Sequence, residues 1–214
     1  MDKKFTEQES LAVISEMIDR ARNNVQKGSG TFMIYWGSMV AITALLNIVL
    51  VFVLIGLSAP PNLSFNIWWI MLPAWIGSFA LQRKRRKSAI VKSHIDNIIS
   101  SVWYAFGISM AIFIVMVFGF AYSLHEYSIF YMINPIIILI TGIGEFITAR
   151  ACRFRPFLYG AFAMWTGSLF SMLATILFAG NGALIQFGIL AVCMVIGFVV
   201  PGYKLNKLAK KHHV

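Results

Sequence analysis

The feature that most constrains this chain is the alternation of long apolar blocks with short basic clusters. Six blocks of mainly apolar residues follow one another along its 214 residues, and each is close to the roughly 20 residues that an α-helix needs to cross a membrane. Charged residues make up only 12% of the chain, about half of what a soluble domain carries. The sequence therefore predicts an all-α, polytopic membrane protein.

The six blocks predict six transmembrane helices joined as three hairpins. They form a transmembrane domain over 31–203, with helices at about 31–57, 65–81, 101–124, 129–149, 157–178 and 183–200. The hairpins look related, because an aromatic–glycine step recurs in the odd helices and an isoleucine–glycine step in the even ones. These steps are Trp36-Gly37, Phe106-Gly107 and Tyr159-Gly160, and Ile76-Gly77, Ile143-Gly144 and Ile196-Gly197. Their concordant spacing predicts a threefold internal repeat.

The basic residues are distributed as the positive-inside rule requires. All 18 lysines and arginines fall in four clusters, at 3–27, 83–92, 150–155 and 204–211, and the alternate connections contain none. Both termini, including the basic tail 204–214, are therefore expected in the cytoplasm. This topology accounts for the net charge of +10 without nucleic acid, and it makes anionic lipids of the inner leaflet an expected partner.

Two amphipathic segments lie outside the predicted membrane helices. In the first, 1–30, Thr6 and Glu9 form a capping box and a Gly28-Ser-Gly30 joint follows the helix. Its apolar face is formed by Leu11, Ile14, Met17, Ile18 and Ala21. The face can lie on the inner leaflet or dock a cytoplasmic protein partner. The second segment, 88–100, is predicted to lie on the inner leaflet.

Two helix ends are marked by proline. Asn134-Pro135 resembles an N-cap followed by proline at the first helical position, so the fourth helix is either kinked or interrupted there. An interrupted helix of that kind lines cavities in transporters. In the last helix, Pro201-Gly202 is expected to stop the helix before the basic tail.

Sequence signals of catalysis are absent. The chain has no HExxH motif, phosphate-binding loop, serine elbow or paired-cysteine site. We therefore expect no enzymatic activity, no metal and no cofactor. The two cysteines, Cys152 and Cys193, fall at a cytoplasmic helix exit and inside an apolar block, so a disulfide is not expected.

Glu145 is the one acidic residue inside a predicted membrane helix, about 7 Å from the boundary marked by Arg150. An ionised group at such a depth is costly and normally faces protein or water. Two interpretations follow. Glu145 can form a proton or cation site with Thr141 and Thr148 nearby, or it can form a structural ion pair with Arg83 or Arg150.

The chain resembles a group of small six-helix bacterial inner-membrane proteins of unassigned function. The resemblance is carried by the opening Glu9-Ser-Leu11 with Met17-Ile18, by the run Gly142–Thr148 and by Pro201-Gly-Tyr203. It implies a bacterial plasma-membrane location and no activity. We expect a non-enzymatic membrane protein that anchors or regulates a cytoplasmic partner; the alternative is a small proton- or cation-coupled transporter or channel that uses Glu145. A homo-oligomer is compatible with both.

Overall fold

The computed structural model describes Leu11 and residues 29–88, 94–178 and 180–211, and all regular structure in these ranges is helical. The elements are α2 (Ser29–Gly56), the 3₁₀ helix η1 (Pro61–Ile70), α3 (Met71–Ser88), α4 (His94–Leu124), the 3₁₀ helix η2 (Tyr127–Met132), α5 (Ile133–Cys152), α6 (Arg155–Leu177), α7 (Gly182–Met194), the π-helical segment η3 (Val195–Val199) and α8 (Val200–Lys211). The predicted all-α class is confirmed.

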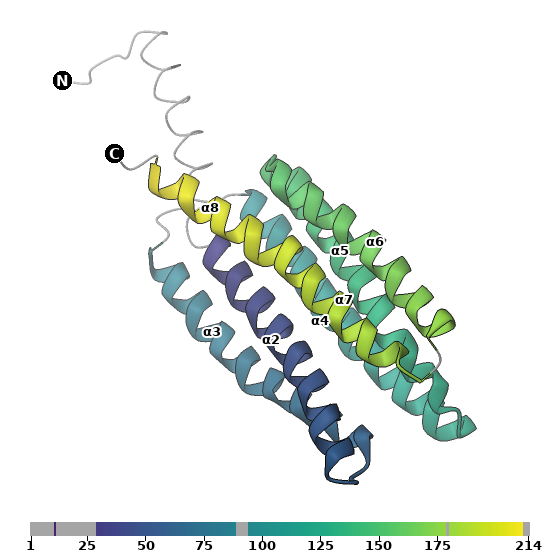
Figure 1. The fold of residues 1–214 in the computed structure, drawn as a ribbon. Helices are drawn as coiled ribbons and strands as arrows, with labels where there is room; N and C mark the ends of the chain where they lie inside the picture. Colours follow the sequence, from purple (N-terminus) through teal and green to yellow (C-terminus); the bar gives the residue numbers. More distant parts are fainter. Residues whose placement is uncertain (1–10, 12–28, 89–93, 179, 212–214) are drawn as a thin grey trace, which may run out of the picture.

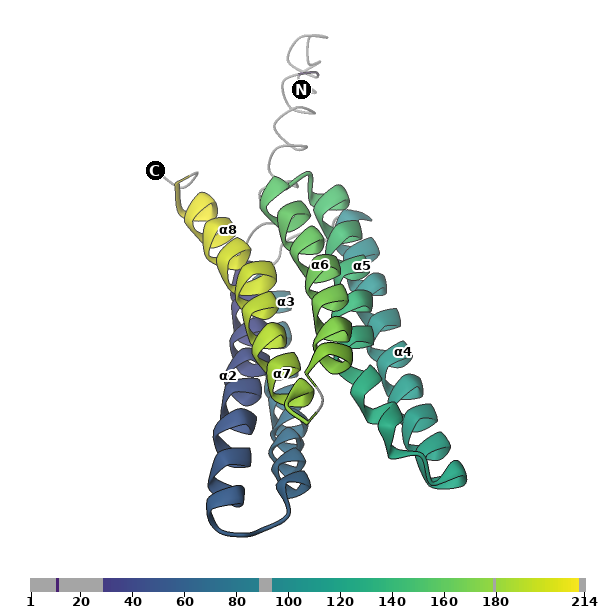
Figure 2. The same cartoon turned by 45° about the vertical axis from the view of Figure 1, so that its right-hand side comes forward.

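The helices form two groups that lie side by side (Figures 1 and 2). In one group α2 packs against α3, α7, η3 and α8, and in the other α5 packs between α4 and α6. Contacts of α6 with α7 and η3 join the groups. The end of α3, the turn between α5 and α6 and the end of α8 lie at the same end of the bundle (Figure 1). We call it the basic end, because these elements carry Arg83, Arg150, Arg153, Arg155, Lys204 and Lys207.

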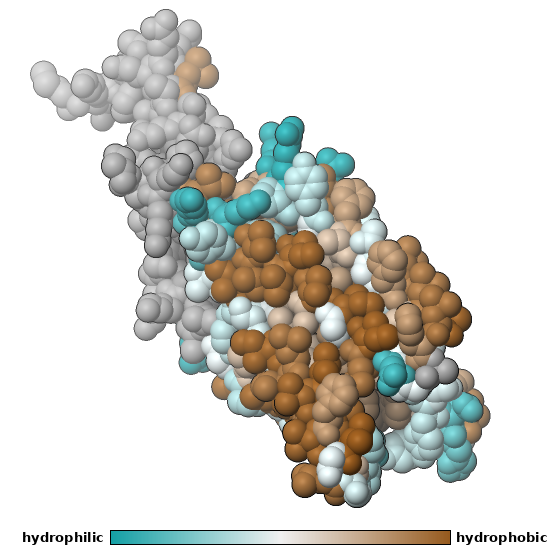
Figure 3. Space-filling view, viewed as in Figure 1, coloured by the Kyte–Doolittle hydropathy of each residue, from teal (hydrophilic) through white to brown (hydrophobic). Residues whose placement is uncertain are grey.

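Within the described ranges, five helices are long and apolar enough to cross a membrane, rather than the six predicted. They are Gly30–Gly56, Asn97–Leu124, Tyr127–Cys152, Arg155–Leu177 and Gly182–Leu208. The outer surface agrees with this, since apolar side chains cover the middle of the face shown in Figure 3 and hydrophilic ones gather toward its ends. The fold therefore supports a helical membrane protein.

The helix predicted over 65–81 does not form as one α-helix. The chain first makes the 3₁₀ helix η1, which begins with Pro61 after an extended Pro60, and becomes α-helical only at Met71. Pro73 then lies in the first turn of α3, where its missing N–H costs no hydrogen bond. The basic run near the end of α3 belongs to the same helix, which makes α3 as a whole too polar to count as a span.

The two central hairpin helices also differ from their predicted limits. Helix α4 begins at His94, so residues 94–100 of the predicted inner-leaflet segment continue into the membrane helix, whereas Ser88 ends α3. The fourth predicted helix is not interrupted at Asn134-Pro135. It changes from 3₁₀ to α geometry at Ile133, with Asn134 and Pro135 in the first α-helical turn.

The last helix does not stop at Pro201-Gly202 but continues to Lys211 through the π-helical segment η3. Proline lacks an N–H, and its ring crowds the carbonyl four residues earlier, which here belongs to Gly197 inside η3. The wider π turn offers room at that point. Gly202 is instead a packing position, because a Cβ atom there would lie 2.8 Å from the carbonyl oxygen of Gly30 on α2.

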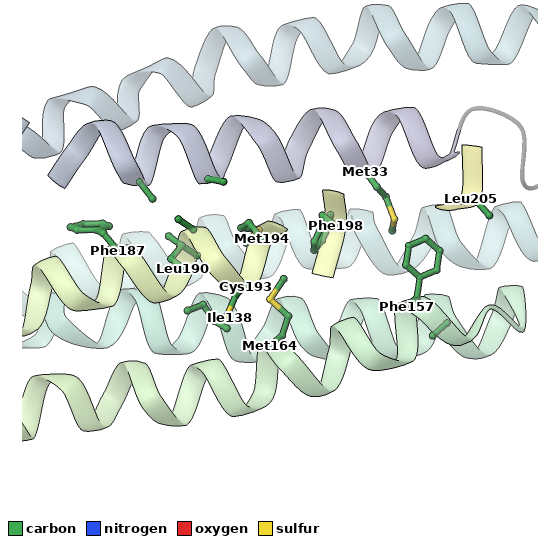
Figure 4. Packing of buried hydrophobic residues seen from close by; sticks show 14 of the residues in the cluster. Met33, Ile138, Phe157, Met164, Phe187, Leu190, Cys193, Met194, Phe198 and Leu205 are labelled. Atoms are coloured by element: carbon green, nitrogen blue, oxygen red, sulfur yellow. The ribbon is translucent and has the colours of Figure 1, made fainter. Parts of the chain in front are cut away.

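The buried core runs between α2, the α7–η3–α8 helix and the α5–α6 pair (Figure 4). Phe187, Leu190, Met194 and Phe198 follow one another along one face of this helix. The spacing of three or four residues between them is what one face of a helix requires. The core thus places the η3 segment directly against α6, where the candidate site lies.

The glycines of the predicted repeat have different surroundings. A Cβ atom on Gly37 would meet the Cβ of Phe198 at 2.6 Å, one on Gly160 would meet Glu145, and one on Gly107 would meet nothing within 4 Å. Gly107 is exposed, so this step does not pack against another helix among the described residues. The threefold repeat stays a prediction.

Candidate functional site

The candidate site is built on the buried face of α5. Ile138, Thr141, Glu145 and Thr148 follow one another at spacings of three or four residues and are all buried, so they share one side of the helix. This side faces α6 and the α7–η3–α8 helix rather than the membrane. Thr141, Glu145 and Thr148, the predicted trio, therefore lie on one face of α5.

Glu145 is completely enclosed, with 0% of its surface exposed. Its carboxyl group lies between two glycines on two other elements. A Cβ atom on Gly160 of α6 would overlap Oε1 and lie 2.8 Å from the carboxyl carbon, and one on Gly197 of η3 would lie 2.9 Å from Oε2. Any larger residue at either position would occupy the space that the carboxyl group fills.

The two glycines also bring their helices into close contact. A Cβ atom on Gly160 would lie 2.9 Å from the Cα of Gly197, and one on Gly197 would lie 2.5 Å from the methyl carbon of Met164. Met164 itself is fully buried. The carboxyl group of Glu145 therefore sits where α6 and η3 approach backbone to backbone, with a methionine beside it.

Neither carboxyl oxygen of Glu145 has a hydrogen-bond partner in the described part of the chain. The two threonines on its face bond elsewhere. The hydroxyl of Thr141 donates to the carbonyl of Ile137 at 2.6 Å, and that of Thr148 donates to the carbonyl of Gly144 at 2.8 Å. The predicted trio is adjacent but is not connected by hydrogen bonds.

The ion pair predicted for Glu145 is not formed among the described residues. Arg150 is exposed, and its guanidinium lies over the ring of Phe146, 5.4 Å from the ring centre. Five residues turn a helix by about 140° beyond a full turn, so Arg150 points away from the face that carries Glu145. Arg83 is likewise exposed, on α3.

The π geometry of η3 is a part of the site that the sequence did not reveal. The N–H of Val200 donates to the carbonyl of Val195, five residues earlier, and Gly197 lies within this widened turn. Such segments occur mostly as single turns, frequently at functional sites. Pro201 soon after Ile196-Gly197 is the one local signal that could have indicated it.

A second buried polar cluster lies toward the opposite end of the same helices. The side-chain amide nitrogen of Gln186 on α7 donates to the carbonyls of Tyr131 and Ser171, at 2.9 and 3.2 Å, and to Oγ1 of Thr175 at 2.6 Å. Nearby, the hydroxyl of Ser168 donates to the carbonyl of Pro135 at 2.8 Å. These bonds connect η2, α5, α6 and α7.

Two cavities lie near these helices, and Glu145 lines neither. An apolar groove of about 760 Å³ runs between α6 and α7, and a smaller cavity of about 310 Å³ lies at the α5–α6 turn. The described residues contain no group of three His, Cys, Asp or Glu side chains that could hold a metal ion. The buried carboxyl group is therefore the chemically distinct feature of this fold.

The predicted docking face of the N-terminal segment is described only at Leu11, which is helical and 66% exposed. Ile14, Met17, Ile18 and Ala21 lie outside the described residues.

No protein-family model, curated protein or solved structure matches this chain. The five long apolar helices support a helical membrane protein, and Glu145 is its enclosed acidic side chain.

Proposed function

We propose that this protein is a small, non-enzymatic membrane transporter or channel in which Glu145 binds and releases a proton or a small cation. The observation that carries the proposal is a carboxyl group with 0% exposure and no hydrogen-bond partner among the described residues. A buried polar group in a folded protein is normally hydrogen-bonded, and one without a partner needs an explanation.

The free-energy cost of a buried charge favours a carboxyl group that is neutralised by the ion it binds. An acidic side chain at mid-membrane costs about 2.5–3.5 kcal/mol on insertion scales, and a structural role would require a partner that offsets this cost. Because neither Arg83 nor Arg150 is paired with it, a proton or a cation is the partner that we propose for the enclosed carboxyl group.

The glycines suggest how the site would open. Gly160 and Gly197 allow α6 and η3 to touch through their backbones, with the side chain of Met164 beside this contact. A shift of η3 between π and α geometry would move Gly197 relative to Glu145. We infer that this shift exposes the carboxyl group alternately to the two sides of the membrane.

The proposed topology has six crossings with both termini in the cytoplasm of a bacterial inner membrane. The sixth crossing is the η1–α3 segment, which returns the chain to the basic end (Figure 1). An even number of crossings keeps every basic cluster on one side, as the positive-inside rule demands.

Reconstitution in liposomes tests the proposal. We expect the wild type to dissipate an imposed proton or sodium gradient, Glu145→Gln to reduce the flux to that of protein-free liposomes, and Glu145→Asp to retain part of it. Glutamine has nearly the same shape but cannot take up a proton or balance a cation. A wild type that carries neither ion, or a Glu145→Gln variant with full flux, would refute the proposal.

The second candidate is the anchoring of a cytoplasmic partner by the N-terminal segment, favoured by the exposed, helical Leu11. Its test is a truncation that removes residues 1–28. It should stop there, because Gly30 packs against Gly202. A partner that co-purifies with the full chain should be lost from the truncated one, whereas unchanged co-purification would contradict anchoring by this segment.

A further inference from the structure

Three arginines surround the cavity at the α5–α6 turn. It has a volume of about 310 Å³ and is lined by Ala149, Arg150, Arg153, Phe154, Arg155 and Leu158. This volume is at the lower end of the roughly 300–1,000 Å³ typical of small-molecule sites. Half of the lining residues are cationic and the others are apolar, which is the lining that an amphipathic anion requires.

The local backbone brings the arginines together. Helix α5 ends at Cys152, Arg153 adopts a left-handed conformation with φ 51° and ψ 40°, and α6 begins at Arg155. On one continuous helix Arg150 and Arg155 would diverge by about 140°. The left-handed residue reverses the chain, so both line the same cavity as Arg153.

Arg153 occupies a position that normally favours glycine. A residue with a side chain costs about 1–2 kcal/mol in this conformation, and helices that end this way usually place glycine there. The N–H of Arg153 closes the helix by bonding to the carbonyls of Ala149 and Arg150, and glycine could do the same. The turn itself therefore does not require an arginine side chain at this position.

The guanidinium groups are available for a ligand. All three arginines are exposed, and within the described ranges none forms an ion pair with an acidic side chain. Arg150 lies on the ring of Phe146, an arrangement that holds its guanidinium in place and leaves its edge free to donate. The N-terminus of α6, at Arg155, adds a partial positive charge.

We propose that this cavity binds the phosphate group of an anionic membrane lipid. The guanidinium group of an arginine can donate two parallel hydrogen bonds to the oxygens of one phosphate group. The cavity lies at the end of two membrane helices, where head groups are found, and Leu158, which is partly exposed, can contact the glycerol and the first part of the acyl chains. The positive-inside rule accounts for basic residues on this side, but not for their convergence on one cavity or for an arginine in a left-handed turn.

The test compares two substitutions that each remove one positive charge from the basic end. Arg153→Gly removes a guanidinium from the cavity and relieves the backbone, so the fold should be kept. Lys204→Gln removes an exposed charge from α8, outside the cavity. The full chain is placed in nanodiscs of phosphatidylcholine with a minor fraction of phosphatidylglycerol, and the phosphatidylglycerol retained by the protein is measured by native mass spectrometry.

We expect the wild type and Lys204→Gln to retain phosphatidylglycerol above its bulk fraction, and Arg153→Gly to lose roughly tenfold in apparent affinity, as for one charge-assisted hydrogen bond. Equal losses in both variants, or no enrichment in the wild type, would overturn the site. Inorganic phosphate is added in a second arm, with chloride at matched ionic strength. If phosphate alone emptied the site of lipid, the ligand would be free phosphate and the lipid assignment would be wrong.

Discussion

Glu145 and Gln186 are two buried polar residues in the same set of helices, and they differ in their hydrogen bonding. Each is at most 2% exposed. Gln186 donates to three acceptors on η2 and α6, whereas both oxygens of Glu145 are without partners in the described chain. Gln186 is thus bound as a structural cross-link should be. Glu145 forms no such cross-link among the described residues, as the proposed proton or cation site requires.

The largest effect on stability is expected from a substitution that fills the space occupied by the carboxyl group of Glu145. Gly160→Ala places a methyl group against the carboxyl group of Glu145 and the backbone of Gly197, so overpacking should cost about 1–3 kcal/mol. Gly107→Ala is the matched control, because nothing lies within 4 Å of its added Cβ. The melting temperatures of the two variants are measured in detergent. Equal melting temperatures would contradict the close packing of Gly160 against Glu145 and Gly197.

The next largest effect is expected from the loss of the hydrogen bonds of Gln186. Gln186→Leu removes the donor to Tyr131, Ser171 and Thr175 and should lower stability by about 1–2 kcal/mol, the range of hydrogen bonds between membrane helices. Ion flux at a temperature where the variant is folded should be unchanged. If Gln186→Leu abolished flux as well, the contrast between a structural and a functional residue would fail.

A smaller effect on stability is expected at the unsatisfied residue. Glu145→Gln keeps the shape of the side chain and removes the potential charge, so unfolding should change by less than about 1 kcal/mol. The measurement is the same melting experiment as for Gln186→Leu. A loss larger than that of Gln186→Leu would indicate that Glu145 has a structural partner after all.

The smallest effect is expected at Arg150. Its guanidinium contacts the ring of Phe146 at the surface, an interaction of about 0.5–1 kcal/mol, so Arg150→Gln should reduce stability by no more than that and leave flux intact. Loss of flux in this variant would indicate that Arg150 does form an ion pair with Glu145.

The sequence predicted what depends on local composition. The apolar blocks and the singular position of Glu145 follow from residue type and spacing. The predicted six-span count differs from the five long apolar helices, because the second block forms the 3₁₀ helix η1 and an α3 that carries a basic run.

What the sequence could not predict depends on contacts between distant residues. Pro201 was expected to end a helix, yet the π turn at Gly197 accommodates it, and the packing of Gly202 on Gly30 keeps the helix against α2. The sequence shows Gly160 and Gly197 as steps of a possible repeat, but only the fold shows that both contact Glu145. The separation of five residues allows an ion pair between Glu145 and Arg150, but Arg150 points in another direction around α5.

The most direct test of the central claim is infrared difference spectroscopy of the reconstituted protein as the pH or the sodium concentration is stepped. The account predicts a carboxyl band that changes with the step in the wild type and in Gln186→Leu, and that is absent in Glu145→Gln. Identical difference spectra for the wild type and Glu145→Gln would contradict it.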